Sequence, residues 1–283
     1  MYKYSLDKSS KKFRCPNCQK KTFVKFIDNE TYHYLNETDG RCDRESKCGY
    51  FKKPNDKQSI TSNVNTPLIV RTPSYHDMKL LSHFQHYKYK NNFINYLLSQ
   101  FDSEDVYRAL SKFVIGSTNY WYGATVFWQI DELYNIRGGK IMQYNCVTGK
   151  RVKKPFNHIS WIHKQLKLND FNLNQCLFGL CNTSCITKGD TICIVESEKT
   201  AIIMSIALPK FLWLATGSKT GFKENMLNPV KEYNIIAYPD KSEYEEWNKT
   251  ATLLNNRGFS IRCSSLLEIT DIEQGGDLVD YII

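Results

Sequence analysis

Hydrophobic and polar positions alternate most regularly in the last third of the chain. Four short apolar runs, rich in β-branched or aromatic residues, occur at 192–195, 211–215, 234–238 and 259–263. Runs of this length and composition are typical of buried strands. Because stretches with helical spacing separate them, we expect a mainly parallel α/β sheet over residues 191–283.

Two of the separating stretches have clear helical limits. Residues 201–206 are almost entirely apolar, and Pro209 is expected to end the helix that they form. Residues 247–254 place apolar side chains on one face, and that helix is expected to close near Gly258. Both helices would cover the sheet.

Residues 76–190 mix helical and strand patterns and predict an α+β subdomain. Ser103 is expected to cap a helix, and the pair Gly138 and Gly139 is expected to mark a turn between two strands. The expected elements are two helices, 92–100 and 103–116, and two strands, 124–130 and 140–144.

The segment 54–75 has no sustained period. It is polar and contains Pro54, Pro67 and Pro73. This composition is typical of an extended or flexible linker. Residues 1–53 are therefore expected to fold as a separate small domain.

Four cysteines in that domain have the arrangement of a metal site. Cys15 and Cys18 form a C-x-x-C pair, and Cys42 and Cys48 form a wider pair with five residues between them. Four thiolates can close a tetrahedral structural zinc site, so we expect a zinc ribbon. The alternatives are His33 in place of one cysteine, a redox dithiol at the first pair, and cysteines without a ligand.

Charge and aromatic residues add a candidate partner for this domain. The chain carries a formal net charge of +9, and residues 1–60 hold 14 Lys and Arg against 8 Asp and Glu. Basic groups attract phosphates and flat rings stack on unpaired bases, so residues 1–60 are hypothesised to bind single-stranded DNA. Some of these rings could instead cover the metal. The rings are Phe13, Phe23, Phe26, Tyr32, Tyr34, Tyr50 and Phe51.

A second basic group lies in the middle subdomain. It could follow a phosphate backbone or hold nucleoside triphosphates, and the alternative is a solvated charged hairpin. Its members are Arg137, Lys140, Lys150, Arg151, Lys153 and Lys154.

Two acids follow strands of the expected parallel sheet. Glu196 comes directly after the first strand, and Asp240 follows the third. Carboxyl ends of parallel strands lie at one edge of the sheet, where ligands bind. Acids gathered there repel each other unless a cation joins them, and carboxylates together with water and phosphate suit Mg²⁺. The alternative for Glu196 is a carboxylate that only favours the first turn of the following helix.

These residues resemble a known family. A strand followed by Glu, then a Gly turn, then a strand followed by Asp is the layout of the Toprim domain of bacterial primases, topoisomerases and some nucleases. The upstream segments NYLLSQFDSEDVYRALSKFVIG, VFWQIDELYNIRGGKIMQYN and CLFGL are similar to successive parts of the bacterial-type DNA primase core. With the ribbon in front, the resemblance covers nearly the whole chain in primase order. ESEKTA is most similar to variants from mobile elements and phages.

The resemblance implies roles for particular residues. Glu196 matches the Toprim glutamate, Asp240 matches the first Asp of the D-x-D motif, and Asp277 resembles an acid after the last Toprim strand. They would hold Mg²⁺ or Mn²⁺ and the incoming triphosphate. Lys199 and the basic group would neutralise phosphate charge. Ser242 stands where the family has the second Asp of D-x-D, and Thr200 where it has another acid; Glu243, Glu245 or Glu198 could compensate.

The resemblance implies a primase-like nucleotidyltransferase that binds single-stranded DNA and makes short primers from nucleoside triphosphates, with a replicative helicase as a candidate partner. The alternative is a Toprim-fold single-stranded-DNA-binding protein without catalysis, and a Toprim nuclease is a third, less favoured hypothesis. No apolar run approaches the roughly 18 residues of a membrane span. Because the first residues lack an apolar secretory region, we expect a cytoplasmic protein with reduced thiols.

Overall fold

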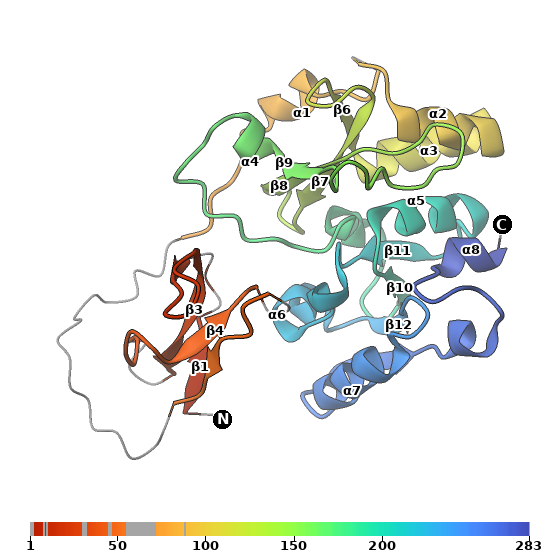
Figure 1. The fold of residues 1–283 in the computed structure, drawn as a ribbon. Helices are drawn as coiled ribbons and strands as arrows, with labels where there is room; N and C mark the ends of the chain where they lie inside the picture. The colour runs from red at the N-terminus through yellow and green to blue at the C-terminus, as the bar shows by residue number, and fades with distance from the viewer. Residues whose placement is uncertain are drawn as a thin grey trace. The chain divides into compact units, whose positions relative to one another are not determined.

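The computed structural model describes residues 3–7, 9, 11–29, 33–44, 47–54, 72–87 and 89–282. The chain divides into two compact units, Met1–Thr72 and Pro73–Ile283 (Figure 1). Most of the predicted linker, residues 55–71, lies outside the described residues, as does Tyr32 of the predicted ring set. Within the described residues, every helix falls short of the length and hydrophobicity that crossing a bilayer requires.

The first unit is a small antiparallel sheet. Its strands run in the order β1-β3-β4-β5, and β2 also pairs with β3. Among the described residues of this unit, the buried apolar side chains are Cys15, Phe23, Val24, Ile27 and Cys42, and only Cys15, Phe23 and Cys42 form a buried cluster, which is too little apolar surface to stabilise a domain without help. The strands are β1 (Tyr4–Leu6), β2 (Phe13–Arg14), β3 (Lys21–Asp28), β4 (Gly40–Cys42) and β5 (Phe51–Lys52).

The second unit begins with helices and an antiparallel sheet in the order β6-β7-β8-β9. The side chain of Asn91 caps α2 by accepting from the backbone N–H groups of Phe93 and Ile94. The helices are α1 (Lys79–His83), α2 (Asn92–Gln100), α3 (Ser103–Phe113) and α4 (Ile162–Gln165), and the strands are β6 (Ile115–Thr118), β7 (Ala124–Ile130), β8 (Ile136–Met142) and β9 (Ile159–Trp161).

Several details of this region differ from the prediction. Helix α3 ends at Phe113 rather than near residue 116, and β8 covers 136–142 rather than 140–144. Asp102, rather than Ser103, caps α3, since its carboxylate accepts from the Glu104 N–H. The glycine pair 138–139 lies inside β8 instead of a turn. A Cβ on Gly139 would come within 2.6 Å of Ile162 and 2.8 Å of Trp128, so glycine serves close packing of α4 on the sheet there.

The rest of the second unit holds a four-stranded sheet in the order β11-β10-β12-β13, with every neighbouring pair parallel. The strand and helix alternation therefore gave the right sheet type. The strands are β10 (Thr191–Val195), β11 (Leu212–Ala215), β12 (Asn234–Tyr238) and β13 (Ser260–Cys263), and the helices are α5 (Glu198–Ala207), α6 (Glu224–Leu227), α7 (Tyr244–Asn255) and α8 (Leu278–Ile282).

Both faces of this sheet are covered. Cys193 and Val195 of β10 join the core that contains α5, whereas Ile192 and Ile194 join the core that contains α7. Successive side chains of a strand point to opposite faces, so a continuous apolar run is what a sheet covered on both sides requires.

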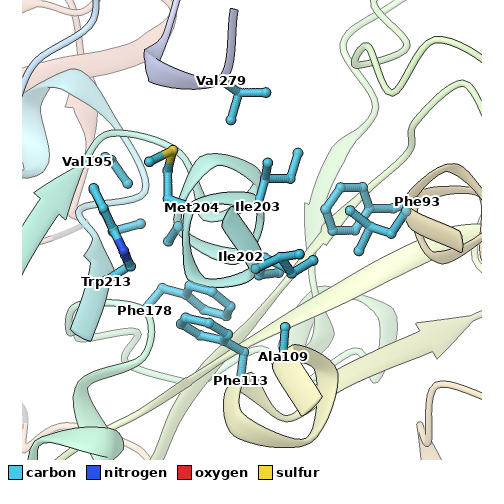
Figure 2. Close-up of a cluster of buried hydrophobic side chains, with 14 of the residues drawn as sticks. Phe93, Ala109, Phe113, Phe178, Val195, Ile202, Ile203, Met204, Trp213 and Val279 are labelled. Carbon is cyan, nitrogen blue, oxygen red and sulfur yellow. The ribbon is translucent and has the colours of Figure 1, made fainter. Parts of the chain in front are cut away.

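Helix α5 is buried on nearly all sides and connects the two halves of the second unit. Figure 2 shows Ile202 and Ile203 of α5 near Phe93 of α2, with Phe113 and Phe178 below and Met204 toward Val195 and Trp213 of the parallel sheet. A helix that is apolar all round belongs in a core rather than on a surface. This packing sets the N-terminus of α5, directly after Glu196, against the antiparallel half.

Candidate metal and active sites

The four cysteines of the first unit converge. Their sulfur atoms all lie within 4.8 Å of one another, with 3.7 Å between Cys15 Sγ and Cys48 Sγ and 3.9 Å between Cys18 Sγ and Cys42 Sγ. Tetrahedral zinc with bonds of about 2.3 Å places its sulfur ligands about 3.8 Å apart. The four thiols therefore fit a structural zinc ion, and the exposed His33 is not part of this group.

The rings of this unit divide between the two uses expected for them. Phe23 is fully buried and packs with Cys15 and Cys42, so it covers the metal group. Phe51 is exposed and stacks on Phe26 with 6.2 Å between the ring centroids. Only the second kind of ring is open to a partner.

Glu196 and Asp240 lie at the carboxyl edge of the parallel sheet. Val195 at the end of β10 pairs with Tyr238 at the end of β12, and the two acids follow these residues. Burial raises the pKa of Asp240 to about 8, with further contributions from the charges of Glu196, Asp277 and other nearby acids. Burial and Glu243 raise the pKa of Glu196. The charge of Glu196 therefore acts on Asp240. Among the described residues, the four cysteines are the group of three or more potential ligands that converges, so a cation shared by the two acids stays a prediction.

Asp277 lies near the same edge, but its oxygens already have partners. Oδ1 accepts from the Val279 N–H at 2.9 Å, and Oδ2 accepts from the Thr200 hydroxyl at 2.6 Å. The Lys199 ammonium lies 3.6 Å from Oδ2. Asp277 therefore joins the start of α8 to the start of α5, and Lys199 is held beside it.

The pattern of residues did not reveal the role of Glu198. Its carboxylate is buried and accepts two hydrogen bonds from Lys140 Nζ, at 2.9 and 3.1 Å, while the same ammonium donates to the Gly217 carbonyl at 2.7 Å. Lys140 was predicted to bind nucleic acid, and here it is buried and paired. The contact joins β8 of the antiparallel half to α5 and to the turn after β11.

Two further acids lie near Ser242, the residue that stands where the family has the second Asp of the D-x-D motif. Glu243 forms an ion pair with Lys219, and its charge raises the pKa values of Glu196 and Asp240, after the effect of burial. Glu268 accepts the backbone N–H of Ser242 at 2.8 Å, and Ser242 itself has a left-handed φ of 78°. Glu243 was among the predicted substitutes; Glu268 comes from 26 residues further on, which no local spacing reveals.

The predicted basic group divides in two. Arg137 donates from Nε to the buried Asp131 at 2.7 Å and lies over the Tyr75 ring, so its charge is compensated. Arg151 is exposed, and its backbone forms an isolated antiparallel β-bridge with Tyr144. Its charge lowers the pKa of Glu196. Within the basic group, Arg151 therefore has the largest effect on the pKa of Glu196. The other exposed members are Lys150, Lys153 and Lys154.

The chain is similar to several solved structures of primases. The primase fragment of the bacteriophage T7 primase-helicase is 13% identical, with a TM-score of 0.42 and coverage of 93% of this chain and 91% of that chain. The DnaG primase catalytic domain bound to ssDNA is 12% identical at 0.46, covering 72% of both chains, and the E. coli primase catalytic core is 14% identical at 0.44, covering 72% and 74%.

Family models match both units. A zinc β-ribbon finger model matches residues 2–63, which agrees with the four converging cysteines. None of the curated proteins matches the chain. A model described as a domain of unknown function, DUF6371, matches residues 91–241, which include the antiparallel half, Glu196 and Asp240. Because this match spans more than half of the 283 residues, the chain belongs to the DUF6371 family.

Proposed function

We propose that this protein is a primase-like nucleotidyltransferase, in which residues 191–283 form a Toprim-type catalytic domain. The observation that carries the proposal is the position of Glu196 and Asp240 after two neighbouring parallel strands, where their charges act on each other. Their order along the chain, and the resemblance of the segments before them to a primase core, favour a primase over a Toprim nuclease.

In this proposal Glu196 and Asp240 hold Mg²⁺ or Mn²⁺, whose charge stabilises the developing negative charge of phosphoryl transfer. Each reaction joins a primer 3′-hydroxyl to the α-phosphate of a nucleoside triphosphate and releases pyrophosphate. Arg151, exposed and acting on Glu196, binds phosphate oxygens of the triphosphate. Asp277 keeps Lys199 and the start of α8 in place, and Lys199 adds positive charge.

The remaining parts of the chain have binding roles in this proposal. The zinc ribbon, residues 1–53, presents basic and aromatic groups to single-stranded DNA, and residues 54–75 are the linker between it and the rest of the chain. The basic subdomain, 76–190, holds the template beside the catalytic domain. A replicative helicase is the proposed protein partner, and a mobile element or phage is the proposed setting.

Primer synthesis tests the proposal. The zinc-loaded full chain, single-stranded DNA, labelled nucleoside triphosphates and Mg²⁺ are expected to give short products that need the template. Glu196→Gln is expected to lower synthesis by at least about 100-fold, because it removes a ligand of the ion. Glu232→Gln makes the same change of charge just before β12, at the opposite end of that strand, and is expected to leave synthesis intact. Synthesis that survives Glu196→Gln would remove Glu196 from the reaction.

One observation favours a second candidate, a single-stranded-DNA-binding protein without catalysis. Ser242 replaces a family carboxylate, and the oxygens of Glu198 and Asp277 are occupied by Lys140, Thr200 and backbone donors. This candidate predicts DNA binding that is independent of Mg²⁺ and the absence of primer synthesis by the unaltered chain. The synthesis assay therefore separates the two candidates directly.

A further inference from the structure

Four ring side chains from two separate loops contact one another in the second unit, and together with the adjacent Tyr122 they are here called the ring patch. Tyr120, Trp121 and Tyr122 lie in the turn between β6 and β7, and Phe156 and His158 lie in the segment before β9. Phe156 stacks on His158 with 4.2 Å between centroids, and Trp121 packs edge-on against His158 at 5.1 Å and against Tyr120 at 4.8 Å. The two loops thus hold their rings together.

The ring patch is open to solvent rather than being part of a core. Tyr122 is 66% exposed, Phe156 53% and Tyr120 43%. Exposing large rings to water is unfavourable in free energy. Groups of exposed apolar side chains therefore mark surfaces that bind a ligand or a partner. None of these rings belongs to the buried clusters that stabilise the fold, although Trp121 packs at the edge of one.

The charge around the patch selects the kind of partner. The three segments that build or flank it, 85–100, 115–130 and 143–158, contain no Asp or Glu at all. Lys90 lies over the Tyr122 ring at 5.1 Å. The patch therefore suits a ligand that is both flat and negatively charged. The described cations of these segments are Lys90, Lys150, Arg151, Lys153 and Lys154.

We propose that the ring patch is a stacking platform for the unpaired bases of single-stranded DNA, with the surrounding cations holding its phosphates. This inference rests on the proposed function in taking a nucleic acid as the substrate, and it adds the surface and the mode of recognition. Stacking accepts any base, so binding is tolerant of sequence. Bases inside a duplex already stack on each other, so single strands are preferred over double strands.

The patch also lies apart from the acids in the chain. The patch is formed by the turn between β6 and β7 and by the 153–158 loop, whereas Glu196 and Asp240 follow β10 and β12. Arg151 and Lys150 belong to the loop that leads from one site toward the other, because Arg151 acts on Glu196 while Phe156 is five residues further on. A template stacked on the rings would have its backbone led along these cations.

Binding of a labelled 20-nucleotide oligo-dT to the zinc-loaded full chain tests the inference. The double variant Tyr122→Ala, Phe156→Ala is expected to weaken binding by about 10- to 100-fold at near-physiological salt, since each stacked ring contributes strongly. Tyr134→Ala is the matched control: its ring is 54% exposed, but it follows the far end of β7. That variant is expected to bind like the unaltered chain, and Tyr122→Trp is expected to retain binding because it keeps a ring.

The outcomes separate this inference from the proposed function. The double variant is first shown to be folded by a far-ultraviolet circular dichroism spectrum equal to that of the unaltered chain. Unchanged oligo-dT affinity in this folded variant would overturn the proposed role of the ring patch. Equal loss in the double variant and in Tyr134→Ala would also overturn it. Glu196→Gln is expected to bind oligo-dT normally. If the unaltered chain makes no primers yet binds through the rings, the enzymatic proposal fails and the ring patch stands.

Discussion

Lys140 and Glu198 are 58 residues apart and form a buried ion pair that also uses the Gly217 carbonyl. A buried pair of this kind is costly to break, because the remaining charge is left without a partner in a poorly solvated place. The pair lies beside the acid edge and joins the two halves of the second unit. At the scale of single residues it is the contact whose loss would matter most for stability.

Lys140→Met is expected to lower the free energy of unfolding by about 3–5 kcal/mol. The double variant Lys140→Met, Glu198→Leu is expected to recover most of this loss, since no unpaired charge remains. Arg108→Met, which breaks an exposed pair with Asp105, is the control and is expected to cost below about 1 kcal/mol. Urea unfolding followed by tryptophan fluorescence measures all three, because every tryptophan lies between residues 121 and 247. Equal losses in Lys140→Met and Arg108→Met would contradict the account.

His76 gives the second prediction at this scale. Its ring is buried against Phe171, at 4.3 Å between centroids, and burial together with the charge of His163 lowers the pKa of His76 to about 4. Because the folded state disfavours the charged ring, the stability contributed by neutral His76 is complete above pH 6.5 and is lost as the pH falls from 6.5 toward 4.

His76→Phe keeps a ring on Phe171 and removes the titration. Between pH 7 and pH 5 the unaltered chain is expected to lose about 1–2 kcal/mol more stability than this variant. His83→Phe, at an exposed histidine, is expected to keep the steeper pH dependence of the unaltered chain. Parallel stability curves for the unaltered chain and His76→Phe would show that the titration of His76 does not affect folding.

These residues show where sequence reasoning succeeds and where it ends. The position of Glu196 and Asp240 at one edge of the sheet could be predicted because each follows a short apolar run typical of a buried strand, and parallel strands share an edge. The pairing of Lys140 with Glu198, and of Glu268 with the Ser242 N–H, could not be predicted, because it depends on packing between elements far apart in the chain. Lys140 looked like a free cation only because its neighbours in sequence are basic.

Among the elements, α5 is the one on which the others depend. A helix over 201–206 was predicted from the sequence, but its burial on nearly all sides, and the elements that bury it, were not. The structure supplies two partners, the sheet and the helices of the antiparallel half (Figure 2). Strands within apolar runs were also predicted well, whereas β6 (IGST) and β9 (ISW) lie outside such runs and carry too little pattern to be recognised.

The zinc ribbon gives a prediction at the scale of elements. Its described core is so small that the metal is expected to hold β2 to β5 together. The full chain is expected to bind about one zinc ion through four thiolates, and Cys42→Ser is expected to lose it. Chelation should then make residues 1–53 sensitive to protease, and metal analysis with limited proteolysis measures both effects.

The control for this experiment lies in the second unit. Because all the tryptophans lie there, its fluorescence-detected unfolding midpoint is expected to stay the same after chelation. Cys146→Ser, at an exposed cysteine outside the metal group, is expected to keep the zinc. Full zinc content in Cys42→Ser would contradict the ribbon site.

The whole molecule combines a small basic unit, which has the four-cysteine metal group, with a larger unit. The larger unit contains the sheet edge with Glu196 and Asp240 and the ring patch. In the proposed reaction, the basic unit and the ring patch bind single-stranded DNA, and the acids bind a divalent ion. The DUF6371 match includes both strands that the acids follow. The central claim is that Glu196 and Asp240 share one ion.

Titration of the zinc-loaded full chain with Mn²⁺, followed by electron paramagnetic resonance, tests this claim most directly. The account predicts about one Mn²⁺ site per chain whose affinity falls at least about tenfold in Glu196→Gln and in Asp240→Asn, because each change removes a carboxylate ligand. Glu232→Gln is expected to bind Mn²⁺ as the unaltered chain does. Equal Mn²⁺ affinity in the unaltered chain, Glu196→Gln and Asp240→Asn would contradict the shared ion.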